Sequence, residues 1–227
     1  MIKLTKSNPA PVSLSSEACK NTLEAVEQKM RNREKVTAKD YGSLYGATDT
    51  RKQLRDDQGD KCAYCEKSLL DEQRHVEHYR PKALYPSLAF TWDNLLGACW
   101  ACNLKKSNCF PLADETVRGN IDDEQPLLIN PYIDDPSEFF EFHEEEIRPK
   151  KGLSGTRLSK AQNTIDTILN RPDLKERRRK AWVDYNQLNI LLQSVNPNHP
   201  AYEKILSMMN EFRDSSHEFS AMFNLQQ

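Results

Sequence analysis

Residues 62–65 read C-A-Y-C and residues 99–102 read C-W-A-C, so two C-x-x-C pairs bracket the segment 66–98. Two residues between cysteines let both thiolates of one turn reach the same ion, and two such turns supply the four ligands of a closed tetrahedral zinc site. The alternatives are a disulfide or a thioredoxin-like redox pair. The presence of two pairs favours zinc, with a structural Zn²⁺ whose binding contributes folding free energy on the order of 10 kcal/mol. The expected ligands are Cys62, Cys65, Cys99 and Cys102.

The composition limits the class of protein. The chain has 227 residues, enough for one large or two small compact units. With 37% hydrophobic and 29% charged residues, it has no run of about 18 apolar residues that could cross a bilayer. Residues 1–12 lack the apolar stretch of a secretory signal, so we expect a cytoplasmic protein without a membrane partner. The net charge of −2 neither favours nor excludes a polyanionic partner, because the local distribution of charge decides phosphate binding.

An ordered set of polar residues lies between and directly after the cysteine pairs. Residues 76–82 read V-E-H-Y-R-P-K, residues 90–95 read F-T-W-D-N-L, and N-L-K-K-S follows at 103–107. An acidic residue before a histidine, then Asp-Asn-Leu, then C-x-x-C-N-x-x-K, resembles the HNH endonucleases. The resemblance implies a ββα-metal hairpin, here bracketed by zinc knuckles, that hydrolyses phosphodiester bonds of a nucleic acid.

Each residue type in this set suits one part of that reaction. Hydrolysis requires a water made nucleophilic and compensation of the charge that develops on the phosphate. His78 can accept the proton of the water, because an imidazole with an ordinary pKa near 6.5 is largely neutral at pH 7. Glu77 and Asn103 offer hard oxygen ligands for a catalytic Mg²⁺ or Mn²⁺. Asn94 resembles the middle asparagine of the family, which orients the loop that bears the general base. Three cations are expected to contact phosphate: Arg80, Lys82 and Lys106.

Several features of the segment leave alternatives open. Neighbouring residues of a strand point to opposite faces, so Glu77 and His78 can face one phosphate only if the strand ends or bulges there. Glu77 stands where many relatives have aspartate, and Asn103 stands where a histidine is common, which leaves the identity of the metal open. Taken singly, Asn94 could be a turn residue and Asn103 a helix N-cap. Three residues fall outside the pattern: His75, expected to be an exposed histidine, and Cys19 and Cys109, expected to be small buried hydrophobes.

Periodicity predicts a mainly helical chain around this segment. Helices are expected from Ser15 or Ser16 through Met30, over 49–57, and in the C-terminal third over 158–168, 174–195 and 202–212. Residues 139–148 are expected to form a β-hairpin. The predicted fold class is therefore α+β, mainly helical, in four parts: an N-terminal helical segment (1–58), an HNH ββα-metal module with a four-cysteine zinc-knuckle site (59–112), an acidic linker with a possible β-hairpin (113–152) and a C-terminal helical bundle (153–227).

Charge is distributed in two blocks of opposite sign. Residues 114–146 contain twelve Asp or Glu and one Arg, whereas residues 148–180 contain eleven Lys or Arg and three acidic residues. The acidic block is expected to shield the cleft or to pair with the basic block. Residues 177–180, which read R-R-R-K, are expected to follow a nucleic-acid backbone or to meet an acidic patch on a partner.

A longer context is similar to the PtuB nucleases of Septu anti-phage systems, including those linked to retrons. It comprises E-H-Y-R-P-K at 77–82, L-I-N-P at 128–131 and I-L-N-R at 168–171. This resemblance implies the ABC-type ATPase PtuA as a partner and, in the retron form, a reverse transcriptase and its DNA product. Two other functions stay open: a non-catalytic zinc module that binds nucleic acid or a partner, and a toxin-like RNase. DNA and RNA are both open as substrates.

Overall fold

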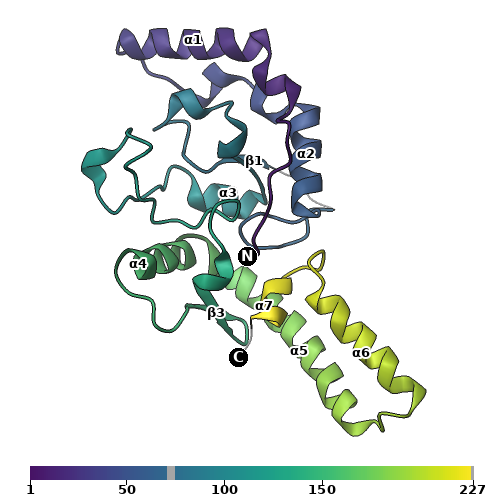
Figure 1. Cartoon of the computed structure of the whole chain (residues 1–227). Coiled ribbons are helices and arrows are strands. Elements are labelled where there is room, and N and C mark those ends of the chain that lie inside the picture. Colours follow the sequence, from purple (N-terminus) through teal and green to yellow (C-terminus); the bar gives the residue numbers. More distant parts are fainter. Residues whose placement is uncertain (71–74, 226–227) are drawn as a thin grey trace.

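Helices dominate the part of the chain that the structure, a computed structural model, describes, which is residues 1–70 and 75–225 (Figure 1). Short 3-10 turns connect the main elements. The helices and strands are α1 (Glu17–Arg31), α2 (Thr48–Gln58), β1 (His75–His78), β2 (Leu95–Ala98), α3 (Trp100–Lys106), β3 (Phe140–His143), β4 (Glu146–Pro149), α4 (Gly155–Thr164), a π-helical turn (Ile165–Leu169), α5 (Pro172–Ser194), α6 (Pro200–Arg213) and α7 (Ser220–Asn224). The predicted class, α+β and mainly helical with a four-cysteine cluster, is confirmed.

The N-terminal helices begin and end at the residues that the sequence marks. The side chain of Ser16 accepts a hydrogen bond from the Cys19 backbone N–H and so caps α1. Helix α2 ends at Gly59, whose φ of 54° lies in the left-handed region that glycine adopts without a Cβ penalty. Both helices were expected, and both are present.

The cysteine-bracketed segment contains two paired strands followed by a helix. Strand β1 runs antiparallel to β2, with His75 opposite Ala98 and His78 opposite Leu95. Helix α3 begins directly after Cys99, whose sulfur accepts the Cys102 backbone N–H at 3.4 Å. The second C-x-x-C pair therefore forms the first turn of α3 and joins it to the end of β2.

Alternation along β2 directs its side chains into two different cores. Leu95 lies in the smaller core with side chains from α1, α2 and the loop before β2. Leu96 lies in the larger core, which contains the four knuckle cysteines and the C-terminal helices. Because successive strand residues point to opposite faces, one short strand holds the N-terminal and C-terminal parts of the molecule together.

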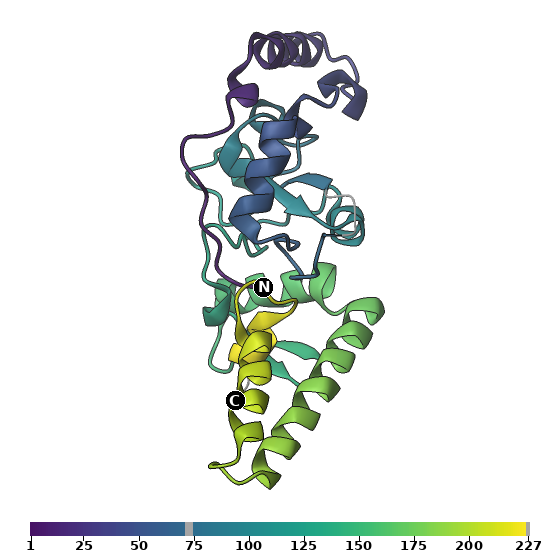
Figure 2. The same cartoon turned by 90° about the vertical axis from the view of Figure 1, so that its right-hand side faces the viewer.

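The C-terminal part begins with the expected β-hairpin and ends with a helical hairpin. Strands β3 and β4 pair antiparallel. Pro172 stands at the first turn of α5, where its missing N–H costs nothing, and so separates α5 from the preceding helix. Helices α5 and α6 then lie side by side and project from the rest of the molecule (Figure 2). Where α7 meets this hairpin, the ring of Tyr185 contacts those of Phe212 and Phe223.

The two charge blocks pair with each other, which is one of the two outcomes expected for the acidic block. Their ion pairs include Arg148 and Lys175 with Glu146, Lys160 with Asp134, Arg157 with Glu138, and Arg179 with Glu145. The alternative that residues 177–180 follow a nucleic-acid backbone is wrong for Arg178, which is 1% exposed and donates to the carbonyls of Glu145 and Leu169. The guanidinium of Arg178 instead fastens the β3–β4 turn to the start of α5.

Two further expectations concern single cysteines and membrane spans. Cys19 is buried as expected, whereas the expectation for Cys109 is wrong because this side chain is exposed. The chain turns at Ser107, which has a φ of 43°, and this turn follows α3 directly before Cys109. Within residues 1–70 and 75–225, none of the helices combines the length and the apolar character that a membrane span needs.

Candidate active site

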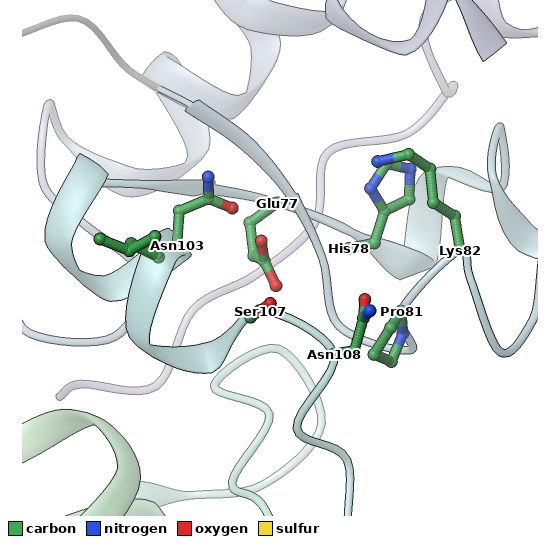
Figure 3. A pocket seen from close by; sticks show the side chains of 8 residues that line it. Glu77, His78, Pro81, Lys82, Asn103, Ser107 and Asn108 are labelled. Carbon is green, nitrogen blue, oxygen red and sulfur yellow. The ribbon is translucent and has the colours of Figure 1, made fainter. Parts of the chain in front are cut away.

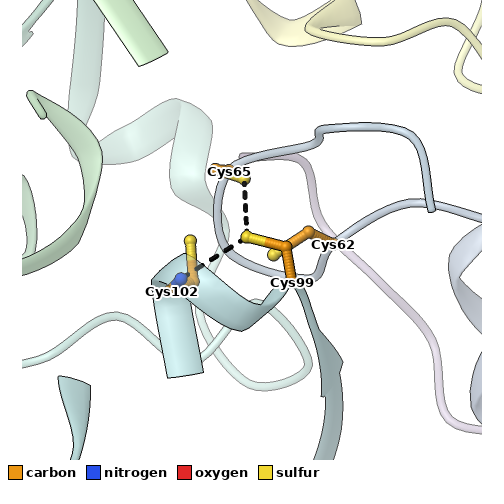
Figure 4. A group of neighbouring side chains, drawn as sticks. All are labelled: Cys62, Cys65, Cys99 and Cys102. Carbon is orange, nitrogen blue, oxygen red and sulfur yellow. Dashed lines mark hydrogen bonds between the residues drawn. The ribbon is translucent and has the colours of Figure 1, made fainter. Parts of the chain in front are cut away.

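The four knuckle cysteines converge on one point (Figure 4). Their sulfur atoms all lie within 4.8 Å of one another, and all four side chains are buried. The Cys65 and Cys99 sulfurs are 3.9 Å apart, far longer than a disulfide bond. Four sulfurs at about 2.3 Å from a tetrahedral Zn²⁺ would be about 3.8 Å apart. The donor type and the spacing therefore fit a closed zinc site, and all four of these cysteines are free rather than joined in disulfides.

Hydrogen bonds from outside the ligand set reach these sulfurs. Arg171 donates from Nη1 to the Cys102 sulfur at 3.2 Å, and its Nε and Nη2 both donate to the carboxylate of Asp173 at 3.0 Å. The pKa of Cys99 lies far below its usual value, mainly because the thiol of Cys102 donates to its sulfur. A guanidinium against a cluster of thiolates offsets their negative charge, so the loop before α5 takes part in the cysteine site.

A separate pocket of about 240 Å³ lies beside the cluster, at the end of β1 (Figure 3). None of the four cysteines belongs to its lining. Glu77 and His78 both line it, although they are neighbours on a strand, because β1 ends at His78. The strand end that the sequence required is thus present. The other lining residues are Pro81, Lys82, Asn103, Leu104, Ser107 and Asn108.

The imidazole of His78 is held in one orientation. Its Nε2 lies 2.9 Å from the carbonyl oxygen of Ala89, and the ring of Tyr45 contacts it edge-on at 4.7 Å between ring centres. A carbonyl oxygen only accepts, so Nε2 carries the proton and Nδ1 keeps its lone pair. Burial, followed by the positive charge of Lys82, lowers the pKa of His78 to about 3, against the opposing effect of the Ala89 hydrogen bond. The imidazole is therefore neutral at pH 7 and can accept a proton.

The carboxylate of Glu77 is one half of a buried ion pair. Lys106 on α3 is 0% exposed, and its Nζ donates to Glu77 Oε1 at 2.7 Å and to the backbone oxygen of His78 at 2.8 Å. Burial raises the pKa of Glu77, and the charge of Lys106 opposes this rise. In Figure 3, Glu77 lies between Asn103 and His78. A carboxylate and an amide oxygen on one pocket wall are donors that suit a hydrated Mg²⁺ or Mn²⁺.

Asn94 lies behind the pocket and connects two loops. Its Oδ1 accepts the Arg80 backbone N–H at 2.7 Å, and its Nδ2 donates to the backbone oxygens of Arg80 and Leu88 at 3.0 and 3.2 Å. Leu88 directly precedes Ala89, whose carbonyl holds His78. Asn94 is therefore placed to orient the imidazole without contacting it.

The three cations expected to contact phosphate have different surroundings. Lys82 lines the pocket, and its Nζ lies 4.9 Å from the ring centre of Tyr45. Arg80 donates from Nε to Glu124 at 2.9 Å, so the acidic block already engages this cation. Lys106 is buried and binds the carboxylate of Glu77, so this lysine already has an anionic partner inside the protein. Phosphate contacts of Arg80 and Lys106 stay predictions.

Sequence reasoning missed several residues of the two sites. The carbonyl of Ala89 and the ring of Tyr45 carry no pattern that would identify them, because both reach His78 only through folding. Arg171 stands in the helix break N-R-P at 170–172, but nothing in the sequence places this cation beside the cysteines. His75 is half-buried, not exposed, and lines another cavity together with Cys99.

Residues 62–109 match the family model described as HNH endonuclease. This match covers both cysteine pairs and the whole set quoted above, with Glu77, His78, Asn94, Asn103 and Lys106 among its residues. This segment is therefore similar to HNH endonucleases, and the residues that line the pocket all lie within it.

Comparison of the whole chain identifies particular relatives. It is similar to the Septu protein PtuB of Bacillus mycoides (strain KBAB4), with 36% identity over 144 residues, which are 55% of this chain and 48% of that protein. A Septu protein PtuB of Bacillus thuringiensis is 34% identical over 139 residues, 60% of this chain and 44% of that protein. The retron Vc95 protein of Vibrio cholerae serotype O1 biovar El Tor, named as a putative HNH endonuclease, is 30% identical over 128 residues, 54% and 58% of the two chains. The chain thus spans about half the length of these relatives.

Proposed function

We propose that this chain is a metal-dependent endonuclease that acts in an antiviral defence complex. The observation that carries the proposal is that Glu77, His78 and Asn103 line one pocket, and that the hydrogen bond from His78 Nε2 to Ala89 leaves the lone pair on Nδ1. A module that only binds nucleic acid does not need a carboxylate, a neutral imidazole and an amide oriented toward the same space.

In the proposed reaction, the residues of the chain bind the phosphate, orient one another and accept a proton. None of them forms a covalent bond to the substrate. Lys82 at the pocket draws a phosphate toward His78. The negative charge of that phosphate favours the imidazolium and so raises the pKa of His78 from about 3, which makes the imidazole a better proton acceptor for water. Lys106 holds the carboxylate of Glu77 in place, and Asn94 holds the loop that orients His78.

Two metals are proposed, with different tasks. Zn²⁺ at the four cysteines would stabilise the module, because four thiolates leave no open coordination position. Mg²⁺ or Mn²⁺ would be held by Glu77 and Asn103. When bound there, the divalent ion would supply positive charge for the phosphate and acidify a water molecule.

The partners are proposed from the relatives. Septu and retron are the systems after which the similar proteins are named. We propose that the chain works with a PtuA-like ABC-type ATPase, and in a retron setting with a reverse transcriptase and its DNA. The projecting α5–α6 hairpin carries exposed apolar side chains, among them Ile190 and Leu191, that suit contact with another protein.

The test is cleavage of DNA and RNA by the purified chain, with and without the neighbouring gene products, in Mg²⁺. His78→Ala should lower the rate by about 10² to 10⁴-fold, the usual size of a general-base effect, with the melting temperature retained. His143→Ala, which removes an exposed histidine, is the matched control. Full activity of His78→Ala would overturn its role as the proton acceptor, and loss of its fold would show that His78 is structural. Absence of cleavage by the unmodified chain under all of these conditions would leave the binding-module alternative.

A further inference from the structure

A groove lies on the outer side of α3, between this helix and the segment that leads into α5. Two cavities of about 400 and 580 Å³ share the lining residues Trp100, Ala101, Arg171 and Asp173, so they form one depression. We call this depression the α3 groove. It is separate from the sulfur cluster, although Cys99 reaches its edge.

An exposed tryptophan forms one wall of the α3 groove. Trp100 stands inside the second C-x-x-C pair and is 61% exposed, while Cys99 and Cys102 on either side of it are buried. The cysteines point inward, so the indole between them is held outward on a short turn. A large aromatic side chain that packs into no core, on a turn fastened by two cysteines, is a rigid platform for a ligand.

The α3 groove meets the active pocket at Leu104. This side chain, 55% exposed, lines both the 240 Å³ pocket and the larger cavity of the groove. One helical turn, about 5.4 Å, separates Leu104 from Trp100. Successive stacked nucleotides of one strand rise about 3.4 Å, so Trp100 lies within about two nucleotides of a phosphate in the pocket.

The larger cavity of the groove has an exposed cation beside the pocket. Lys105, the residue after Leu104, is exposed and lines this cavity, so it can contact a phosphate of a strand that enters the pocket. Arg171 and Asp173 balance each other through their two hydrogen bonds, and Asp166 accepts a hydrogen bond from Gln162.

We propose that the α3 groove is a stacking subsite for an unpaired base of a single-stranded or locally opened nucleic acid. The inference rests on the proposed nuclease function and adds the substrate class. The base stacks on the indole of Trp100, and Lys105 lies beside the flanking phosphates. Base pairs of an intact duplex keep their faces covered, so a duplex cannot use this platform.

The test measures binding of labelled single-stranded DNA, single-stranded RNA and duplex oligonucleotides to the full chain with His78→Ala, which should slow cleavage about 10² to 10⁴-fold. In this background, Trp100→Leu keeps an apolar side chain but removes the ring, and it should weaken single-strand binding about 5- to 100-fold. Trp100→Phe keeps a ring and should stay within about threefold of the parent. Ile133→Ala removes an exposed apolar side chain elsewhere and should change nothing. Comparison of the DNA and RNA arms identifies the sugar that the groove accepts.

Equal single-strand affinity of Trp100→Leu and the parent would overturn the stacking subsite and would assign the groove to a protein partner. Equal losses in Trp100→Leu and Trp100→Phe would also overturn it, because stacking requires the phenyl ring to substitute. If the unmodified chain cuts nucleic acid while Trp100→Leu binds normally, the subsite alone fails. If the unmodified chain neither binds nor cuts any nucleic acid, the proposed function fails with it.

Discussion

The four-cysteine cluster and the pocket at the end of β1 are built from the same short elements, yet they differ in chemistry and in access. The cluster offers four sulfurs, each side chain at most 3% exposed, inside the larger core. The pocket offers a carboxylate, an amide and an imidazole around about 240 Å³ of open space. Soft ligands that close around a point suit a structural ion, whereas hard ligands beside open space suit an ion that keeps its waters.

Helix α3 connects the two sites. Cys102 faces the cluster, and Asn103, the next residue, lines the pocket, because consecutive helical residues point about 100° apart. The position of Asn103 therefore depends on the anchoring of Cys102. The cysteine cluster thus supplies the rigidity on which the geometry of the pocket depends.

The largest effect should come from the sulfur cluster. Cys62→Ser removes one of four ligands and should abolish most of the folding free energy that zinc contributes, on the order of 10 kcal/mol. We expect loss of the bound metal, measured by elemental analysis, together with loss of the cooperative thermal transition. Cys109→Ser changes an exposed cysteine outside the set and should leave both unchanged. A stably folded, metal-free Cys62→Ser protein would show that metal binding at the cluster is not needed for folding.

The next largest effect should come from the ion pair under the pocket. Lys106→Met leaves the buried carboxylate of Glu77 without its partner and should lower the free energy of unfolding by about 3 to 5 kcal/mol in urea titrations. Adding Glu77→Gln removes the stranded charge and should restore most of the loss. Lys105→Met, at the neighbouring exposed lysine, is the control. If the single and double variants are equally unstable, the pair does not explain the burial of Lys106.

The smallest effect should come from the contact that links the cluster to the C-terminal part. Arg171→Gln removes the guanidinium from the Cys102 sulfur and should weaken zinc binding about tenfold, the lower end for residues that support a metal ligand. Competition with a chromophoric chelator measures this loss, and the visible absorption of the Co²⁺-substituted cluster should shift. Arg177→Gln, at an exposed arginine paired with Glu218, should leave both readouts unchanged. An unaltered Co²⁺ spectrum in Arg171→Gln would show that the contact does not act on the sulfurs.

Local patterns predicted much of this molecule. The limits of α1 and α2, the β3–β4 hairpin and the break before α5 follow from caps, turns and proline, which act within a few residues. The convergence of the four cysteines was also predictable, because C-x-x-C spacing restricts what two turns can do. The roles of Glu77, His78 and Asn103 came from an ordered set of residue types, and they stay predictions until cleavage is measured.

Contacts between distant parts of the chain were not predictable in the same way. The pairing of Lys106 with Glu77 spans 28 intervening residues, and the approach of Arg171 to Cys102 spans 68. Burial, not sequence spacing, decided that Lys106 meets a carboxylate and that Arg178 lies inside the protein. Cys109, which follows the turn at Ser107, likewise lies exposed.

The amino-acid sequence by itself determined the residue types, their spacing and hence the two kinds of site, since ligand chemistry and turn geometry are local properties. Only the tertiary structure decided which nitrogen of His78 remains an acceptor, which cations are already paired and which tryptophan faces solvent. These outcomes depend on packing between segments far apart in the chain, and packing decides solvent access and therefore charge.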